Sequence, residues 1–341
     1  MNDKYIVYYP YDGTNAYIKN MKRCWGRIYK VIPLSCVENN IYVLRHTKAI
    51  VLNWVEGGFL DSGKKRQLFL YKRLGIKIIW VFHNRIPHAC IDDADNEAKA
   101  RKDMRFLAGI SSAILLHSRH SRIYAEEYTK TLSKIFYVPH VDYTKQYRWT
   151  DERVNDENQE FTYVFQGVIA PYKNIELLIR VFKDLDMEQC RLHIAGKPCN
   201  REYGERIEKL CRDSRIRIRL EYLLEYDVGE ELRRGDVVVL PYDLRSSMNS
   251  GAMLNAFTNK RTVIVSNNAM AQDYENEDFL YIYGYKDEEE HYQHLKAAMR
   301  QAYLNGKSDN RKKGERAYQY TRMHNDDNAV VQRLSEILKS I

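Results

Sequence analysis

VVVLPYDLRSSMNSGAMLNAFTNKRTVIV, residues Val237 to Val265, contains two apolar runs separated by a polar segment and a short helical pattern. The first run is rich in β-branched residues and ends at Pro241, which predicts a buried strand that stops there. Asn249 and Ser250 suit the cap of a helix that begins at Gly251, and the second apolar run predicts another buried strand. This order of elements is typical of an open parallel α/β sheet.

The predicted helix start also suggests a ligand. Backbone N–H groups in the first turn of a helix have no intrahelical acceptor, and the helix dipole adds partial positive charge there. Ser250, Gly251 and Ala252 therefore predict a phosphate site at the carboxyl end of a strand. An ordinary connection that binds nothing would show the same residues, so the rest of the chain must decide between the two interpretations.

Strand and helix patterns alternate through the whole chain. The predicted strands of the first half are 5–9, 28–32, 49–55, 76–82, 113–116 and 135–138, and those of the second half are 161–165, 191–195, 216–222, 237–241, 261–265 and 279–283. Such alternation predicts the α/β class, with two Rossmann-like, doubly wound parallel sheets in two domains that face each other across a cleft.

The polar, weakly periodic segment 139–160 is the predicted interdomain linker. We therefore expect an N-terminal acceptor-binding domain over 1–150 and a C-terminal donor domain over 151–322. The last helix, 323–341, is expected to pack back on the first domain.

The composition of the 341 residues, 44% apolar and 29% charged, is that of a soluble globular protein. The longest apolar runs are too short to cross a bilayer, and the N-terminus lacks a secretory signal pattern. The six cysteines show no paired CxxC spacing, which argues against a zinc site and a disulfide framework. We expect a cytoplasmic protein, with a peripheral position on the cytoplasmic face of the membrane as an option.

The charge is unevenly distributed. Residues 1–150 carry 25 Lys and Arg against 13 Asp and Glu, whereas the remainder carries 29 against 33. A basic first half, with runs such as Lys64-Lys-Arg66, suggests an anionic membrane surface or a phosphate-bearing substrate. A merely solvated basic surface is an equal alternative. Nucleic acid is not expected because no binding motif accompanies the charge.

Ligands of open parallel sheets bind beyond the carboxyl ends of the strands. That rule selects six loops, at 10–15, 56–63, 83–88, 167–174, 196–199 and 243–251. The first strand is not followed by a G-x-G-x-x-G pattern, and no Walker loop is present, which disfavours a dinucleotide oxidoreductase and an NTPase.

The loops of the second half suit a diphosphate. Lys173 places a cation beside a predicted helix start, although a solvated lysine is the plainer alternative. The neighbouring loops add Gly167, Gly196 and Lys197 to the predicted donor-binding residues.

Histidines follow the strands of the first half. His83, His88 and His117 lie in strand-end loops, where a neutral imidazole can bind a hydroxyl or act as a base. A buried structural histidine is as good an interpretation for each. We expect His83 to be catalytic because it directly ends the most apolar strand, with Glu56 as the leading carboxylate. The predicted acceptor-binding residues are Gly13, Asn15, Asn84, His88 and His117. The Asp93-x-Asp95 pair is interpreted as a solvated turn, and no metal site is predicted.

Three segments resemble the GT-B glycosyltransferases of the family 4 type. Residues 167–179, GVIAPYKNIELLI, resemble their G-R-L-x-x-x-K-G-x-x-x-L-I segment. Leu240-Pro-Tyr, followed by Asn249-Ser-Gly and by NAFTNKRTVI from Asn255, resembles their donor-site helix and the next strand. His83-Asn-Arg-Ile-Pro-His88 is similar to an H-N-x-x-P-H segment of some bacterial members.

The resemblance implies transfer of a hexose-type sugar from a UDP- or GDP-linked donor to a glycan or polyprenyl-diphosphate-linked acceptor in surface polysaccharide assembly. It implies no cofactor and no required metal. Lys173 and the amides around Gly251 would hold the donor diphosphate, and His83 would face the reacting sugar or the acceptor. The family's two E-x7-E carboxylates are replaced by Ser247 and Asn255, and its usual arginine by Val168. Ser247, Asn249 and Asn255 complete the predicted donor-binding set.

Two other functions fit the same residues. A GT-B isomerase like the UDP-sugar 2-epimerases would need carboxylates in the cleft, for which Glu56 is the best candidate. A nucleotide-sugar binding module without activity is compatible with the missing E-x7-E pair.

Overall fold

The computed structural model describes residues 4–341 except 14, 39, 57, 92, 147–159, 186, 188 and 246. Its contacts divide the chain into two compact units. Unit 1 comprises 1–141, 245–249 and 325–341, and unit 2 comprises 142–244 and 250–324. The predicted boundary at 150 lies outside the described residues. The segment 245–249, assigned to the second domain from the sequence, groups with unit 1 instead.

The sheet of unit 1 is fully parallel, in the order β2-β1-β3-β4-β5-β6. Its central strands are apolar and buried on both faces, as parallel strands covered by helices must be. The strands are β1 Tyr5–Tyr9, β2 Lys30–Ile32, β3 Thr47–Asn53, β4 Lys77–Val81, β5 Ala113–Leu116 and β6 Ile135–Tyr137. β3 ends two residues earlier than predicted because Trp54 takes a left-handed φ of 47°.

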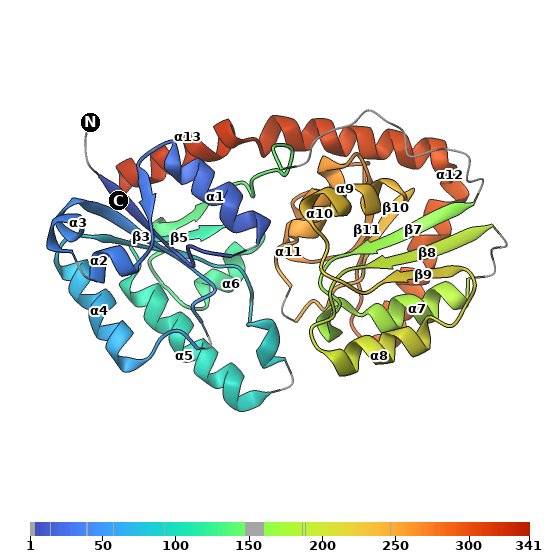
Figure 1. The fold of residues 1–341 in the computed structure, drawn as a ribbon, viewed down its shortest axis with the longest axis horizontal. Helices are drawn as coiled ribbons and strands as arrows, with labels where there is room; N and C mark the ends of the chain where they lie inside the picture. The colour runs from blue at the N-terminus through green and yellow to red at the C-terminus, as the bar shows by residue number, and fades with distance from the viewer. Residues whose placement is uncertain are drawn as a thin grey trace. The chain divides into compact units, whose positions relative to one another are not determined.

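Helices cover both faces of this sheet (Figure 1). One face packs against α1 and α13, and the other against α4 and α5. The helices of unit 1 are α1 Ala16–Gly26, α2 Ser35–Glu38, α3 Ile41–His46, α4 Ser62–Arg73, α5 Ala94–Ile110, α6 Arg122–Glu126 and α13 Asp327–Ser340, with the 3-10 turns η1 His88–Cys90 and η2 Leu132–Lys134. Helices α2 and α3 were not predicted, since they are too short for a helical period to show.

Helix α13 lies against α1 within unit 1. The Arg23 guanidinium donates two hydrogen bonds to the Asp327 carboxylate, at 2.9 and 2.8 Å. Val330, Leu334 and Ile337 enter the core at helical spacing. Apolar burial and one bidentate ion pair therefore hold the end of the chain on the first unit.

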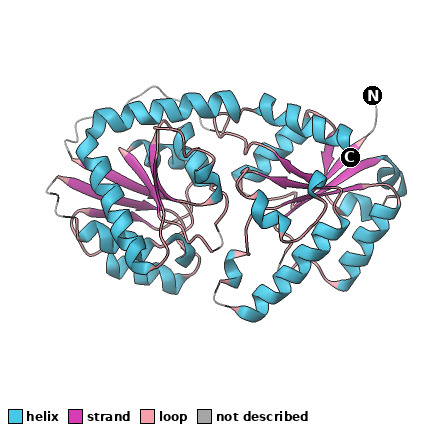
Figure 2. Cartoon of the chain, turned by 180° about the vertical axis from the view of Figure 1, so that it is seen from behind, coloured by secondary structure: helices cyan, strands magenta, loops and turns pink. Residues whose placement is uncertain are grey.

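Unit 2 repeats the architecture, in the order β12-β11-β10-β7-β8-β9, again all parallel. Its strands are β7 Phe161–Gln166, β8 Cys190–Ala195, β9 Ile216–Arg219, β10 Val237–Leu240, β11 Thr262–Ser266 and β12 Tyr281–Tyr283. Its helices are η3 Pro171–Lys173, α7 Ile175–Lys183, α8 Arg201–Leu210, α9 Glu225–Arg233, α10 Gly251–Thr258, α11 Ala269–Gln272 and α12 Glu288–His324. The two parallel sheets with flanking helices, seen from behind in Figure 2, confirm the predicted fold class.

Helix α12 joins two helices that were predicted separately, over 286–304 and 309–321. Gly306 has a left-handed φ of 74° and kinks the chain. The Asn310 side-chain amide donates to the carbonyls of Ala302 and Gly306, at 2.7 and 2.8 Å, and so satisfies the groups that the kink releases. In the described part of the chain, no helix has the length and apolar character needed to cross a bilayer.

Candidate functional site

The loop after β4 carries His83, the predicted catalytic residue. His83 is only 6% exposed and stands at the carboxyl edge of the unit 1 sheet. Its ring stacks on Trp54, with 4.1 Å between ring centroids and 17° between planes. Tyr17, from the start of α1, meets the same imidazole edge-on at 4.9 Å. Aromatic rings from helix α1 and from the loop after β3 therefore fix the orientation of His83.

Asn53, the last residue of β3, sets the tautomer of His83. Its side-chain amide nitrogen donates to the Tyr9 carbonyl at 2.9 Å, which turns its Oδ1 toward the imidazole. The His83 Nε2 lies 3.0 Å from that oxygen and must carry a proton to donate to it. The other nitrogen, Nδ1, then carries the lone pair. Nδ1 has no hydrogen-bond partner in the part of the chain that the structure describes.

His117 has a different role from the predicted contact with an acceptor. It is 1% exposed, and its Nδ1 donates to the Val138 carbonyl at 3.0 Å. Its Nε2 is therefore an acceptor for the Tyr17 hydroxyl, at 2.7 Å. Because both ring nitrogens are occupied, His117 positions Tyr17, and neither nitrogen is available to an acceptor in this arrangement. His140 packs beside both, 5.3 Å from His117 and 5.2 Å from Tyr17 between ring centroids.

The three clustered histidines are neutral at physiological pH. Burial lowers the pKa of His83 well below its usual range, and the neighbouring rings of His117 and His140 add to that shift. Burial likewise lowers the pKa of His117 to about 3 and that of His140 to about 4. A neutral His83 with a lone pair on Nδ1 can accept a proton or a hydrogen bond from a hydroxyl.

Glu56 lies three residues beyond β3 and is 8% exposed. Burial raises the pKa of its carboxyl group to about 7. Neither carboxylate oxygen has a hydrogen-bond partner among the described residues. Of the neighbouring side chains, Trp80 lowers the pKa of Glu56 and Asp103 raises it, but burial has the larger effect. No hydrogen bond joins Glu56 to His83 in the described chain. The two predicted catalytic residues thus follow adjacent strands with no hydrogen bond between them among the described residues.

Four of the predicted site residues are joined by contacts within unit 1. Asn84 and Ser247 pair as an isolated antiparallel bridge, and the Asn249 side-chain amide donates to the His83 carbonyl at 2.9 Å. Asn249 is therefore not the helix cap that the sequence suggested. Both Ser247 and Asn249, predicted to bind the donor, lie against the loop of His83.

A cavity of about 470 Å³ lies beside this loop. Arg85 and Arg245 line it together with Asp93 and Glu97. The Arg85 guanidinium stands 4.9 Å from the centre of the Tyr124 ring. Asp93 also caps α5, accepting from the Asn96 amide at 3.1 Å.

The remaining predicted acceptor residues lie in neighbouring loops. Asn15 caps α1 by accepting from the Tyr17 amide at 2.9 Å, and both Asn15 and Gly13 are exposed. His88 begins η1 and is half-buried. In the described chain, no group of three or more His, Cys, Asp or Glu side chains is arranged to hold a metal.

In unit 2, Lys173 occupies an aromatic cage. Its ammonium lies 3.5 Å from the centre of the Tyr242 ring and 4.8 Å from that of Tyr172. It pairs with no carboxylate in the described part of the chain, and burial lowers its pKa to about 7. Cation–π contacts stabilise the ammonium but leave its N–H donors unsatisfied. When Lys173 is protonated, its N–H donors are therefore free to bind an anion.

Backbone contacts fix the loop that carries Lys173. Gly167 and Gly196 end β7 and β8, and a Cβ added to Gly196 would lie 1.7 Å from the Gly167 carbonyl oxygen. Only glycine permits this approach and the φ of 148° at Gly196. The Ile169 amide donates to the Lys197 carbonyl at 3.0 Å, while the Lys197 side chain is exposed.

The start of α10 faces the same tyrosine. Ser250 caps the helix by accepting from the Met253 amide at 3.1 Å, and its hydroxyl lies 3.4 Å from that of Tyr242. The Ser250 amide is directed at the Met270 sulfur, 3.2 Å away. The amides of Gly251 and Ala252 have no acceptor in the described chain. Of the three amides in the predicted phosphate site, that of Ser250 is therefore already directed at a partner, and those of Gly251 and Ala252 are not. Tyr242 lies between this helix start and Lys173.

Asn255, at one of the two E-x7-E positions, lies inside α10 and is 8% exposed. Its Oδ1 accepts from the Asn259 side-chain amide at 3.2 Å. The side-chain oxygen of Asn255 therefore already accepts a hydrogen bond within the helix.

The sequence interpretation missed four residues that shape these sites: Asn53, Trp54, His140 and Tyr242. Tyr242 directly follows the proline that ends a predicted strand, a position that could have marked it, whereas Asn53 and Trp54 fell inside the predicted strand 49–55 and His140 in the predicted linker. Their partners, however, come from other loops, so no local pattern reveals the contacts.

The comparison with known sequences gives two kinds of match. The profile of the family described as "Glycosyl transferases group 1" matches residues 148–320. GDP-mannose:glycolipid 4-beta-D-mannosyltransferase of Xanthomonas campestris pv. campestris is 34% identical over 112 residues, which form 31% of this chain and 32% of that protein. The chain thus matches about a third of the length of that relative.

Solved structures match the fold along the whole chain. HepE of Anabaena, in complex with UDP, has a TM-score of 0.73 at 10% identity and covers 99% of this chain and 100% of its own. Sucrose-phosphate synthase of Thermosynechococcus elongatus has a TM-score of 0.74 at 11% identity. The match covers 99% of this chain and 98% of that protein's chain. Likeness at these identities shows the fold alone. The family profile, however, spans half of the chain and confirms the predicted resemblance, so the chain belongs to the family of glycosyl transferases group 1.

Proposed function

We propose that this protein transfers a hexose from a UDP- or GDP-linked sugar to a glycan or lipid-linked acceptor. The observation that carries the proposal is the Lys173 ammonium in its aromatic cage, without a carboxylate partner and linked through Tyr242 to two free helix amides. A diphosphate supplies the anionic oxygens that both groups lack.

The chemistry at the donor follows from that pairing. Negative charge grows on the nucleoside diphosphate as the bond to the sugar breaks. Lys173 and the amides of Gly251 and Ala252 are preorganised to stabilise that charge, without reorganisation during the reaction. Ser247 and Asn255 replace carboxylates with neutral groups, so the site relies on backbone amides and a lysine.

The chemistry at the acceptor is assigned to His83. Its Nδ1 lone pair is suited to accept the proton of the attacking hydroxyl, and Asn53 keeps the proton of the free enzyme on Nε2. Glu56, with a pKa of about 7, is the second candidate for proton transfer. The cavity lined by Arg85 and Arg245 is the proposed acceptor pocket.

The proposed acceptor is a glycan or a polyprenyl-diphosphate-linked sugar, and the proposed cellular role is surface polysaccharide assembly. The name of the Xanthomonas relative, a glycolipid mannosyltransferase, supports a lipid-linked acceptor. An anionic membrane surface is a proposed partner of the basic first 150 residues. Of the basic run in α4, Lys64 and Lys65 already pair with Glu38 and Asp103, which leaves Arg66 as the better position for charge reversal.

The test combines binding with product analysis. The purified protein is titrated calorimetrically with UDP- and GDP-sugars, and nucleotide release and the recovered sugar are then measured. We expect Lys173→Ala to weaken donor binding about tenfold or more, because a charge-assisted contact is lost. Lys209→Ala, an exposed change on α8, is the matched control.

The outcomes separate the three functions. Nucleotide release with sugar transfer supports the transferase. An altered sugar without release indicates an isomerase, and binding without either indicates a binding module. Equal donor affinity in Lys173→Ala and the wild type would show that the diphosphate assignment is wrong.

A further inference from the structure

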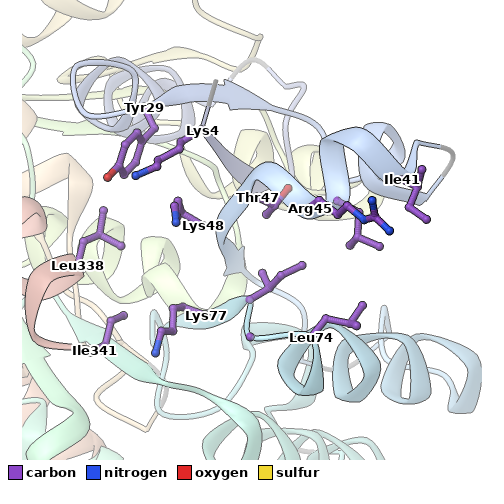
Figure 3. Close-up of a pocket in the computed structure, with 13 residues that line it drawn as sticks. Lys4, Tyr29, Ile41, Arg45, Thr47, Lys48, Leu74, Lys77, Leu338 and Ile341 are labelled. Atoms are coloured by element: carbon purple, nitrogen blue, oxygen red, sulfur yellow. The ribbon is translucent and has the colours of Figure 1, made fainter. Parts of the chain in front are cut away.

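A cavity of about 660 Å³ lies at the amino edge of the unit 1 sheet (Figure 3). Asn53 and His83 follow the carboxyl ends of β3 and β4, whereas the cavity is lined by residues at the beginnings of the same strands. It therefore lies at the opposite edge of the sheet from the candidate catalytic residues. The family resemblance and the proposed function assign nothing to this edge.

Three lysines enter the cavity from three neighbouring strands. Lys4 directly precedes β1, Lys48 is the second residue of β3, and Lys77 begins β4. In the ladder Tyr5 pairs with Thr47, and Ile6 pairs with Ala49, so Lys48 is an extra residue at a bulge. A bulge redirects a side chain relative to the regular pleat. Adjacent strands are about 4.8 Å apart, so three strand starts in a row concentrate like charge.

No carboxylate side chain of the described lining balances these lysines. Arg45, from the end of α3, adds a fourth cation to the lining. None of the four side chains forms an ion pair, a hydrogen bond or a cation–π contact with any residue that the structure describes. The described lining residues include no aspartate or glutamate. Elsewhere in unit 1, by contrast, Lys64 and Lys65 have carboxylate partners.

Apart from Tyr29 and Thr47, the remaining side chains of the lining are apolar. Leu338 and Ile341 of the C-terminal segment lie on the side of the three lysines, and Ile41 and Leu74 lie on the side of Arg45 (Figure 3). Ile41 is 68% exposed and Leu74 is 57% exposed. The cavity thus combines unpaired cations with apolar side chains that are open to solvent, and its volume is in the range of small-molecule sites.

We propose that this cavity binds an amphiphilic phosphate, meaning a phosphate or diphosphate ester of an apolar group. Inorganic phosphate would pair with the lysines but leave the apolar side chains in water. A neutral apolar molecule would bury them but leave the cations without partners. A ligand with both parts satisfies both surfaces. It can reach the cavity either as a soluble phosphate ester or as the headgroup of a membrane lipid.

The test compares two double variants with the same change in charge. Lys48→Gln with Lys77→Gln removes two cations of the cavity, and Lys99→Gln with Lys102→Gln removes two exposed cations of α5. The full-length protein is titrated calorimetrically with octyl phosphate below its aggregation limit, and with inorganic phosphate and octanol separately. Each titration is repeated in a Lys173→Ala background, because the proposed donor site can also take a phosphate. Thermal unfolding verifies that each variant is folded.

We expect the cavity variant to bind octyl phosphate about tenfold more weakly or worse, and the α5 variant to bind it like the wild type. Octyl phosphate should bind more tightly than either of its two parts. Sedimentation with phosphatidylcholine vesicles, with and without phosphatidic acid, distinguishes the sources. Loss of vesicle binding in the cavity variant supports a lipid headgroup, and an effect on octyl phosphate alone supports a soluble ester. Unchanged affinity in both assays would overturn the proposal. Nucleotide-sugar binding should be unaffected, so this result is independent of the proposed function.

Discussion

The carboxyl edges of the two sheets share a topology but differ in chemistry. At the edge of unit 1, histidine rings pack against aromatic side chains, and burial keeps them neutral. At the edge of unit 2, a lysine is held by two tyrosines next to unsatisfied helix amides. The same strand–loop–helix architecture therefore holds neutral imidazoles in one unit and a lysine between two tyrosine rings in the other.

The difference arises from what each loop packs against. Trp54 and Tyr17 fix the His83 ring, and Asn53 fixes its proton, so that edge is determined by side chains. The unit 2 edge is determined largely by backbone, through the Gly167–Gly196 contact and the first turn of α10. Mutations should consequently affect the two edges in different ways.

The largest effect is expected for His83→Gln. The glutamine side chain can still donate a hydrogen bond to Asn53. An amide is too weakly basic, however, to take the proton from the attacking hydroxyl group of the sugar acceptor. We expect the transfer rate to fall about 10²- to 10⁴-fold, while donor affinity changes little, because the diphosphate contacts belong to unit 2. Steady-state transfer assays and donor titration measure the two quantities. A comparable loss of donor affinity would remove the distinction between the edges.

A smaller but global effect is expected for Gly196→Ala. The added Cβ would meet the Gly167 carbonyl oxygen at 1.7 Å, and alanine is strained at a φ of 148°. We expect the free energy of unfolding of unit 2 to fall by about 3 kcal/mol or more. Chemical denaturation measures it, with Gly109→Ala as the control, because a Cβ there meets nothing within 4 Å. An unfolding midpoint like that of the control would mean that the two loops separate easily.

The smallest effect is expected for Tyr242→Phe. Phenylalanine keeps the ring over the Lys173 ammonium and loses only the 3.4 Å contact with the Ser250 hydroxyl. Donor affinity should change about threefold or less, whereas Tyr242→Ala should weaken it more because the cage opens. Calorimetric titration of both variants checks the order. If the phenylalanine variant were the weaker one, the hydroxyl rather than the ring would matter.

Much of the fold follows from local pattern. The apolar run that became β4 and the run that became β10 were predicted within a residue or two, because buried parallel strands are apolar throughout. The short helices α2 and α3 escaped prediction, and the early end of β3 depends on the single backbone conformation of Trp54.

The candidate site was predicted less completely, for a physical reason. Lys173 and the start of α10 have local signals, namely a cation before a helix and a cap before small residues. The role of Tyr242 depends on two loops meeting, and the contact of Asn249 with the His83 carbonyl depends on residues 166 positions apart. Such contacts are decided by tertiary packing, which the sequence pattern does not encode locally.

The central claim, that the caged ammonium of Lys173 binds the donor diphosphate, is tested most directly by the pH dependence of donor affinity. Burial lowers the pKa of free Lys173 to about 7, so the ammonium is mostly protonated at pH 6 and mostly neutral at pH 8. A bound diphosphate favours the protonated form, and affinity should therefore be highest on the acid side.

The measurement is a calorimetric titration with a UDP- or GDP-sugar at pH 6, 7 and 8, for the wild type and for Lys173→Arg. The account predicts that wild-type affinity falls about tenfold from pH 6 to pH 8. The arginine variant should show no such fall, because its guanidinium stays charged. A wild-type affinity that is constant over this range, or a fall of equal size in the arginine variant, would contradict the claim.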